Sequence, residues 1–143
     1  MNKNKISIYT PCFNEEKNIQ YCYSKIKDLF KNKLKDYDYE HIFGDNCSED
    51  NSLEILRDIS SKDKNVKVIS YSRNFGAFQS LYNGAISATG DAIICISADL
   101  QDPPELIPKM IEKWQNGYDV VYGKKIAREE SFVMENLRKF YYK

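Results

Sequence analysis

Residues 91–105 read DAIICISADLQDPPE, and this stretch decides the fold. Residues 92–96 are all apolar, which predicts a strand buried on both of its faces, as in a parallel sheet. Asp102, Pro103 and Glu105 then predict a helix start, with Asp102 as the N-cap, the proline at the first helical position and the glutamate completing a capping box. The stretch therefore predicts a strand, a turn and a helix in immediate succession, as in an α/β protein.

Asp99 and Gln101 fall between this strand and this helix. In an open parallel sheet, the carboxyl ends of the strands line the crevice where ligands bind. Carboxylate and amide oxygens are suitable ligands for a hard cation. The two side chains are therefore candidate metal ligands beside a predicted pocket. The simpler alternative is that both are ordinary turn residues.

The alternation of strand and helix patterns continues on both sides of this stretch. Short apolar or alternating runs predict four more strands, at residues 6–10, 39–44, 66–71 and 118–122. Asn14 is the predicted N-cap of the first helix. Helical spacing predicts four inward faces, formed by Ile19, Cys22, Tyr23, Ile26, Leu29 and Phe30, by Leu53, Ile55, Leu56 and Ile59, by Phe78, Leu81, Tyr82, Ala85 and Ile86, and by Leu106, Ile107, Met110, Ile111 and Trp114. The resulting order predicts an α/β fold with a mostly parallel sheet and helices on both faces.

Length, charge and cysteine content exclude several classes of protein. A chain of 143 residues is long enough for one domain with a sizeable core. Lys and Arg number 21, as do Asp and Glu, and this zero net charge argues against nucleic acid as a partner. The chain has four cysteines without a C-x-x-C pair and a single histidine, which disfavours a zinc site. We expect the cysteines to be reduced thiols, and the histidine to lie in a strand without a chemical role. Without a transmembrane-length apolar run or a signal peptide, the chain is expected neither to span a membrane nor to be secreted.

Polar loops follow four of the predicted strands. They are PCFNE at residues 11–15, DNCS at 45–48, RNFG at 73–76 and SADLQ at 97–101. Neither G-x-G-x-x-G after the first strand nor G-x-x-x-x-G-K-[ST] is present, which disfavours a dinucleotide-binding domain and a P-loop enzyme. Because the carboxyl ends of parallel strands share one edge of a sheet, the four loops are expected to converge on one cleft.

This combination resembles the family 2 glycosyltransferases with the GT-A fold, and within them the polyprenyl-phosphate glycosyltransferases (the dolichol-phosphate mannose synthase and bactoprenol glucosyltransferase group). The resemblance rests on DLQDPPE at residues 99–105, with RNFG upstream and GYDVVYG at 117–123 downstream. It implies a Rossmann-like GT-A fold. It also implies a nucleotide-sugar-binding catalytic domain at residues 1–128, followed at 129–143 by the start of a C-terminal amphipathic helix that the chain end truncates.

The resemblance also assigns roles to individual residues. Asp99 and Gln101 match the catalytic pair that binds Mg²⁺ or Mn²⁺, and Lys125 and Arg128, together with Lys124, fall in the loop that meets the acceptor phosphate. The matching nucleotide-binding set is Pro11, Phe13, Glu15, Asp45, Arg73, Ser97 and Ala98. Two positions depart from the family pattern. Ser97 stands where the D-x-D motif has its first Asp, and Asn46 replaces the second acid of the usual D-D-G-S.

The function implied is that of an inverting glycosyltransferase that moves a sugar from a UDP- or GDP-sugar to a polyprenyl phosphate at the cytoplasmic face of the membrane. The resemblance is also compatible with a homo-oligomer. A phosphate acceptor is already an anion and needs no general base, whereas a sugar hydroxyl must lose its proton during attack. Asp102 is assigned to the helix cap, and no second well-placed carboxylate precedes residue 128, so the chemistry favours the phosphate.

Three alternatives remain open from the sequence. The first is the same fold acting on a glycan hydroxyl in cell-envelope polysaccharide synthesis. The second is a non-catalytic nucleotide-sugar-binding module, which Ser97 motivates. The third is an unrelated flavodoxin-like domain, which would show no metal-dependent affinity for nucleotides.

Overall fold

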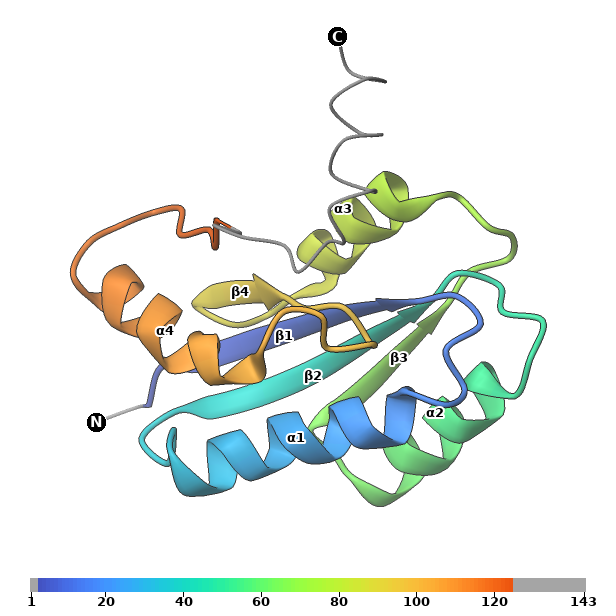
Figure 1. Ribbon diagram of the computed structural model, residues 1–143, viewed down its shortest axis with the longest axis horizontal. Helices are drawn as coiled ribbons and strands as arrows, with labels where there is room; N and C mark the ends of the chain where they lie inside the picture. Colours follow the sequence, from blue (N-terminus) through green and yellow to red (C-terminus); the bar gives the residue numbers. More distant parts are fainter. Residues whose placement is uncertain (1–2, 125–143) are drawn as a thin grey trace, which may run out of the picture.

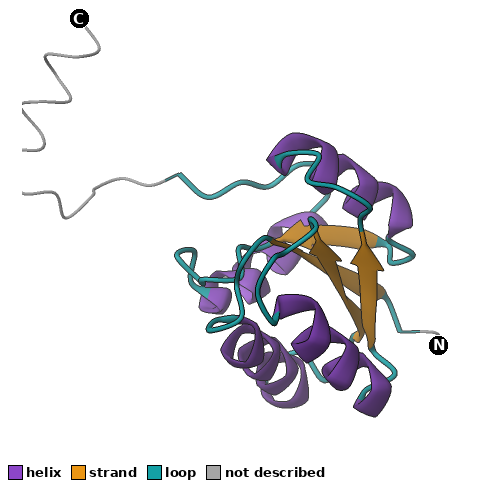
Figure 2. Cartoon of the chain, turned by 90° about the vertical axis from the view of Figure 1, so that its right-hand side faces the viewer, coloured by secondary structure: helices purple, strands orange, loops and turns teal. Residues whose placement is uncertain are grey.

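A computed structural model describes residues 3–124 and shows a four-stranded parallel sheet in the order β3-β2-β1-β4. Helices lie on both sides of the sheet (Figures 1 and 2), which confirms the predicted architecture. The elements are β1 Lys5–Cys12, α1 Ile19–Asn32, β2 Asp38–Asp45, α2 Ser52–Lys62, β3 Val66–Ser70, α3 Ala77–Ser87, β4 Ala92–Cys95, the 3₁₀ turn η1 Pro104–Leu106 and α4 Ile107–Gln115.

β1 is the central strand, and it is two residues longer at its carboxyl end than the sequence pattern predicts. It pairs with β2 along its whole length, from Lys5 opposite Asp38 to Cys12 opposite Asp45, but with β4 only as far as Tyr9. The carbonyls of Tyr9 and Cys12 accept hydrogen bonds from the chain after β4 and after β2 respectively. Because successive residues of a strand direct their backbone groups to opposite sides, the nitrogen of Pro11 points toward the β4 side of β1. The pairing with β4 has already ended at Tyr9, so the missing N–H of the proline costs no hydrogen bond between strands.

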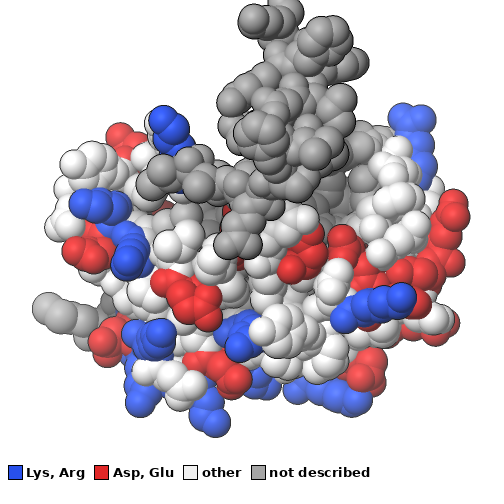
Figure 3. Space-filling model, in the orientation of Figure 1, with Lys and Arg blue, Asp and Glu red and all other residues white. Residues whose placement is uncertain are grey.

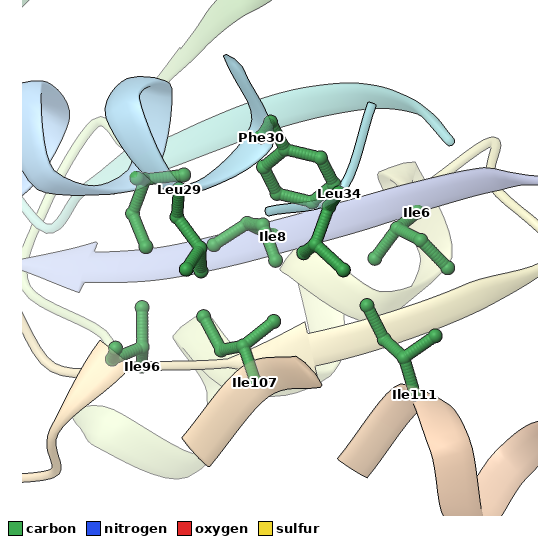
Figure 4. Packing of buried hydrophobic residues seen from close by; sticks show 9 residues of the cluster. Ile6, Ile8, Leu29, Phe30, Leu34, Ile96, Ile107 and Ile111 are labelled. Carbon is green, nitrogen blue, oxygen red and sulfur yellow. The ribbon is translucent and has the colours of Figure 1, made fainter. Parts of the chain in front are cut away.

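One face of the sheet carries the main hydrophobic core. Ile6 and Ile8 of β1 pack against Leu29 of α1 and Ile107 of α4 (Figure 4). A second cluster of buried residues lies under α2. Its members are Cys12, Ile19, Cys22, Phe43, Leu56, Ile59, Val66 and Ala98. The inward positions predicted for α1 are confirmed, with Tyr23 partly buried and the others buried.

The other face is covered by α3, and here the predicted inward face is wrong. Ser80 and Gly84 are the buried residues of α3, whereas Phe78 is 89% exposed and Ile86 is 65% exposed. The reason is the ring of Tyr9, which rises from β1 on this face and donates a hydrogen bond from its hydroxyl to the carbonyl oxygen of Ser80 (2.7 Å). A large buried ring needs small residues opposite it, so the helix turns its small-residue side to the sheet.

β4 is less buried than its apolar sequence predicts. Ile93 and Cys95 are exposed, because α3 lies over β1 and β2 and leaves this face of β4 open. The fifth strand predicted at residues 118–122 is also wrong: this segment is irregular, and Tyr122 is 81% exposed. A strand needs a partner for its backbone, and within residues 3–124 the outer edge of β4 pairs with none.

Two predicted helix starts are corrected. α1 begins at Ile19 with Asn18 as its N-cap, because Asn14 adopts a left-handed backbone conformation (φ 57°) and lies in the loop after β1. The segment after β4 begins as the turn η1, whose N-cap is Pro103 rather than Asp102, and no N-cap side chain of η1 or α4 makes a capping hydrogen bond. Pro103 is extended (ψ 126°) because the ring of the following proline disfavours helical backbone.

Glu40, which is buried, joins the strands on the α3 face through ion pairs with two partly exposed lysines and through hydrogen bonds. Burial by itself would raise the pKa of Glu40, but the hydrogen bonds that reach it outweigh this effect and hold the pKa well below its usual range. Its partners are Lys67 (2.6 Å), Ser7 (2.7 Å), Thr89 (2.7 Å) and Lys5 (3.0 Å). The carboxylate therefore connects three strands and the loop that leads into β4.

His41 of β2 lies beside Glu40 in the sequence, and its ring is fully enclosed. Nε2 is 3.0 Å from the hydroxyl of Thr10, and the ring packs on Phe43 at 3.9 Å between centroids. Burial lowers the pKa of His41 to about 3. The ring is therefore neutral in the folded protein, and His41 lies in a strand, as predicted.

Stability is expected to fall on acidification well before the carboxylates titrate. The unfolded chain binds a proton at His41 below about pH 6.5, whereas the folded chain does so only near pH 3, so the free energy of unfolding falls across this window. Between pH 7 and pH 5 the loss is about 2 kcal/mol. Urea unfolding of the wild type and of His41→Gln at both pH values measures it. Equal pH dependence in the two proteins would contradict the assignment.

Candidate functional site

The carboxyl ends of the strands are joined by backbone hydrogen bonds at one edge of the sheet. The N–H of Asn46 donates to the carbonyl of Cys12 (2.8 Å), and the N–H of Tyr71 donates to the carbonyl of Asp45 (2.9 Å). On the other side of β1, the N–H of Ile96 donates to Tyr9 (3.0 Å). The loops that follow all four strands therefore begin side by side, as predicted.

The loops after β1 and β2 hold each other through reciprocal contacts. Asn14 donates its N–H to the hydroxyl of Ser48 (3.0 Å), and its side-chain oxygen accepts from the N–H of Glu49 (2.8 Å). The N–H of Glu15 donates to Ser52 Oγ at the start of α2 (2.8 Å). Polar residues that the sequence assigned to a helix cap and a turn thus build a fixed rim on this edge.

Residues with strained backbone conformations lie in the loops at this edge of the sheet. Among residues 3–124, the non-glycine residues with positive φ are Asn14 (57°), Cys47 (64°) and Leu100 (53°). They follow β1, β2 and β4 respectively. Residues with a Cβ occupy this region at an energetic cost, and such positions cluster at binding and catalytic sites. Three in neighbouring loops mark this edge as a candidate site.

Asp45 is the most buried acid of this edge. It is 0% exposed, its Oδ2 accepts a weak hydrogen bond from the N–H of Ser48 (3.4 Å), and its Oδ1 has no hydrogen-bond partner among residues 3–124. The hydroxyl of Ser97, after β4, is likewise buried and has no hydrogen-bond partner in the part of the chain that the structure describes. Buried polar atoms in native proteins are nearly always hydrogen-bonded. Two orphaned oxygens, after strands that flank β1, therefore indicate that a ligand or ordered water completes them.

Asp99 and Gln101 share one tight turn. Oδ1 of Asp99 accepts the N–H of Gln101 (3.2 Å), and the N–H of Leu100 donates to the carbonyl of Ser97 (3.2 Å). Both side chains are exposed. Within residues 3–124, no group of three or more His, Cys, Asp or Glu side chains is arranged to hold a metal. A carboxylate and an amide on one turn suit a cation such as Mg²⁺, which binds few protein ligands and keeps water and phosphate oxygens.

The remaining predicted residues lie around this edge in different environments. Phe13 is 44% exposed, while Glu15 accepts a hydrogen bond from the side chain of Asn18 (2.7 Å). Pro11 belongs to β1. Ala98 is buried in the core, so only its backbone faces the edge. Among the predicted residues, Phe13, Asp99 and Gln101 thus have exposed side chains, whereas the side chain of Asp45 is enclosed.

Arg73 is held against an aromatic ring that the sequence did not single out. Its guanidinium carbon lies 4.6 Å from the centre of the Phe75 ring, which meets the ring of Tyr71 edge-on at 6.1 Å. The cation and both rings are on the loop between β3 and α3. Phe75 is only two residues from Arg73 in the RNFG segment, and this proximity in the sequence could have indicated it.

A groove of about 970 Å³ runs from the turn along β4 and α4. Gln101 and Asp102 line one part of it, and apolar side chains of Ile93, Met110 and Trp114 line others. The groove lies next to Asp99 and Gln101 rather than over Asp45 and Arg73. Gln101 therefore belongs both to the turn after β4 and to the groove, whereas Asp45 and Arg73 do not line the groove.

The two buried cysteines of the described chain are unreactive. Burial raises the pKa of Cys22 to about 12 and raises that of Cys12 further, so neither thiol is a nucleophile at neutral pH. Figure 3 shows acidic and basic side chains interspersed on the face it presents, in keeping with the zero net charge. The edge offers oxygen ligands, aromatic rings, the guanidinium of Arg73 and the exposed thiol of Cys47.

The sequence matches the family model described as glycosyl transferase family 2 over residues 7–141. The chain belongs to glycosyl transferase family 2. This confirms the resemblance inferred from the DLQDPPE, RNFG and GYDVVYG segments.

Relatives of this family 2 chain include bactoprenol glucosyl transferases. It is 43% identical over 138 residues to the uncharacterized glycosyltransferase YkcC of Bacillus subtilis (strain 168), covering 96% of this chain and 42% of that protein. It is 43% identical over 124 residues to the prophage bactoprenol glucosyl transferase homolog of Escherichia coli (strain K12), covering 87% and 40%. The bactoprenol glucosyl transferase of Shigella phage SfX is 41% identical with the same coverage. The chain thus spans about two fifths of the length of these curated relatives.

Solved structures of glycosyltransferases share the fold of this family 2 chain. A mannosyltransferase from Pyrobaculum calidifontis, in complex with GDP-mannose and Mn²⁺, matches with a TM-score of 0.64 at 18% identity, over 80% of this chain and 33% of that one. Glucosyl-3-phosphoglycerate synthase from Mycobacterium tuberculosis, in complex with Mn²⁺, UDP and phosphoglyceric acid, matches with a TM-score of 0.61 at 26% identity, over 82% and 41%. The α/β architecture is therefore that of the GT-A glycosyltransferases.

Several predictions for the family 2 chain concern its carboxyl-terminal part. Lys125 and Arg128, as well as the amphipathic helix at residues 129–143, lie outside the described residues. Lys124, at the end of the described part, lines the groove. Within residues 3–124, no helix combines the length and the apolar character needed to cross a membrane.

Proposed function

We propose that residues 1–128 form the nucleotide-sugar-binding catalytic domain of a glycosyltransferase that moves a sugar from a UDP- or GDP-sugar to a polyprenyl phosphate. The observation that carries the proposal is the pair of orphaned buried oxygens, Asp45 Oδ1 and Ser97 Oγ, at the edge that also bears the Asp99–Gln101 turn. The names of the bactoprenol glucosyl transferases at 41% to 43% identity support the acceptor. Residues 129–143 are then the start of the C-terminal helix.

The donor nucleoside binds at the rim formed by the loops after β1 and β2. The free oxygen of Asp45 accepts a hydrogen bond from the base or the ribose, since a carboxylate is acceptor-only. The exposed ring of Phe13 offers a surface for stacking, and the guanidinium of Arg73 offers charge to the diphosphate. The hydroxyl of Ser97 donates to the ribose or to a bound water.

Asp99 and Gln101 would hold a divalent cation, Mg²⁺ or Mn²⁺, when the nucleotide-sugar binds. When bound, such an ion acts as a Lewis acid that stabilises the negative charge of the leaving group. The relative from Mycobacterium tuberculosis contains Mn²⁺ together with UDP, which supports this use of the turn. The carboxylate of Asp99 supplies the one full charge of the pair.

The acceptor phosphate attacks the anomeric carbon directly. A phosphate oxygen forms the new bond to that carbon as the bond to the nucleotide diphosphate breaks, which inverts the configuration. No proton has to be removed from the phosphate, so no general base is required. Lys125 and Arg128 pair with the acceptor phosphate. This acceptor places the protein at the cytoplasmic face of the membrane.

Sugar transfer from a panel of UDP- and GDP-sugars tests the proposal, with polyprenyl phosphate in detergent as acceptor. We expect lipid-linked sugar of inverted configuration with one nucleotide, loss of product with EDTA, and recovery with Mn²⁺ or Mg²⁺. Transfer that is indifferent to EDTA would contradict the metal assignment. Nucleotide-sugar binding without any turnover would instead support a non-catalytic module.

Asp102 provides a test of the acceptor class. It precedes Pro103, the N-cap of η1, and lines the groove beside Gln101, so a role as a base for a sugar hydroxyl is a second candidate. With a phosphate acceptor, Asp102→Asn should change the rate less than about threefold, whereas removing a general base costs about a hundredfold or more. A loss of the larger size, with a glycan as the better acceptor, would favour the hydroxyl acceptor.

A further inference from the structure

Asn46 lies at the centre of a hydrogen-bonded cluster that joins three segments of the carboxyl edge. Its backbone N–H donates to the carbonyl of Cys12 at the end of β1 (2.8 Å). Its side-chain oxygen accepts from the N–H of Phe75 (2.9 Å), and its side-chain nitrogen donates to Oδ1 of Asn74 (2.8 Å). Asn46 is 6% exposed, whereas Asn74 and Phe75 are exposed, so the contacts are shielded from water on the Asn46 side. One residue therefore ties the ends of β1 and β2 to the loop at residues 73–76.

The direction of the hydrogen bonds in this cluster is fixed by backbone donors. A backbone N–H can only donate, so the side-chain atom opposite it must be an oxygen. Phe75 fixes the oxygen of Asn46 in this way, and the N–H of Gly76, 2.8 Å from Oδ1, fixes the oxygen of Asn74. The link between the two amides must then run from the nitrogen of Asn46. Position 46 needs one donor and one acceptor.

The loop that Asn46 holds carries Arg73. The guanidinium stacks on Phe75, whose backbone N–H is the one bonded to Asn46. Gly76, whose φ of 81° is open to glycine at little cost, ends the loop and is the N-cap of α3. The place of Arg73 at the edge therefore depends on backbone that the side chain of Asn46 fixes.

We infer that Asn46 is a positioning residue that holds Arg73 and Phe75 in place for the nucleotide diphosphate, which rests on the proposed function. The departure from D-D-G-S has a physical meaning in this chain. A carboxylate at position 46 has no proton to donate, so it would confront Oδ1 of Asn74 with a second acceptor. If the Asn74 amide turned over to donate, Gly76 would lose its acceptor instead. Either arrangement breaks one of the three bonds.

Two isosteric variants separate this role from the effect of added charge. Asn46→Asp removes the donor and keeps the shape. Asn74→Asp adds the same charge one contact away but keeps the acceptor that Asn46 and Gly76 both use. Combined, the variants place two carboxylates face to face, so Asn74→Asp should be far more harmful in the Asn46→Asp background than alone.

The first measurement needs no ligand. Hydrogen exchange of peptides containing residues 73–76, in the full-length protein, should be about tenfold faster in Asn46→Asp and close to wild type in Asn74→Asp. Exchange in β1 should match wild type in both, which shows that the fold is intact. Equal protection of the loop in wild type and Asn46→Asp would overturn the inference.

The second measurement is steady-state sugar transfer. Asn46→Asp should raise the KM for the nucleotide-sugar about tenfold more than Asn74→Asp does, with kcat changed less than about threefold, because a displaced Arg73 weakens binding of the donor. Equal KM values in the two variants, with the exchange difference intact, would overturn the positioning role. If the wild type binds neither UDP nor GDP, the proposed function and this role both fall, while the exchange data still report on the cluster.

Discussion

Asp99→Asn is expected to lower kcat/KM for sugar transfer about a thousandfold. The variant keeps the shape of the turn, because an asparagine oxygen can still accept the N–H of Gln101 as Asp99 does now (3.2 Å). What it removes is the negative charge that would hold the divalent cation. Stabilisation of a leaving group by such an ion amounts to several kcal/mol, and about 4 kcal/mol corresponds to a thousandfold change in rate. Initial rates across a Mn²⁺ titration measure it, and the apparent affinity for Mn²⁺ should fall together with the rate.

Glu105→Gln is the matched control for this variant. Glu105 is an exposed acid of the following turn η1, so its substitution changes the net charge equally without touching the Asp99–Gln101 turn. We expect its rate to stay within about twofold of wild type. Full activity in Asp99→Asn, or equal losses in the two variants, would remove Asp99 from the metal site and leave only a general effect of surface charge.

The parts of the fold that the sequence predicted are those whose signals are local. The buried side of α1 follows from the spacing of its apolar residues, since neighbours three and four apart share a face wherever the helix lies. The parallel sheet follows from the alternation of strand and helix. The gathering of the four loops follows in turn, because strands that run the same way end at the same edge.

The errors arise where a distant part of the chain decides the outcome. The strand predicted at residues 118–122 has the right composition, but within the described chain this segment lines the groove together with β4 and does not pair with the open edge of that strand. Asp102 has the right spacing for an N-cap, but Pro104 forces Pro103 into extended backbone and the helix begins later. This error affects the site, because Asp102, which the sequence pattern assigned to a helix cap rather than to catalysis, lines the groove.

The sequence predicted where the candidate site lies and several of its residues, but not the contacts between them. Asp45 and Ser97 were assigned to the nucleotide by resemblance, and their role stays a prediction, although each has an orphaned oxygen at the expected edge. Asn46 stood out only as a departure from the family pattern. Its partners Asn74 and Phe75 are 28 and 29 residues away in the sequence. No periodicity or local motif reports a pairing over that distance, so it required the structure.

Gly84→Ala is expected to destabilise the protein by about 2 kcal/mol, which is opposite in sign to the usual effect of this change. In an exposed helix interior, replacing Gly by Ala gains about 1 kcal/mol, because glycine is the poorer helix former. Here a Cβ at Gly84 would overlap the ring of Tyr9, and that ring is confined on its other side by Gly44, where a Cβ would overlap it as well. The ring has no room to retreat, and overpacking of a buried site costs about 1 to 3 kcal/mol. Urea unfolding gives the difference in free energy directly.

A background in which Tyr9 is replaced by leucine separates packing from propensity. Tyr9→Leu is itself destabilising, because it removes the buried ring and the hydrogen bond to Ser80 (2.7 Å). With the ring gone, Gly84→Ala should become neutral or stabilising, while Ser87→Ala, at an exposed position of α3, should stay within about 0.5 kcal/mol of its parent in both backgrounds. If Gly84→Ala costs the same in both, Tyr9 is not what sets the face that α3 turns to the sheet. If the sign reverses, the orientation of α3 depends on one tyrosine of β1, and the loop that leads from Arg73 into α3 depends on it too.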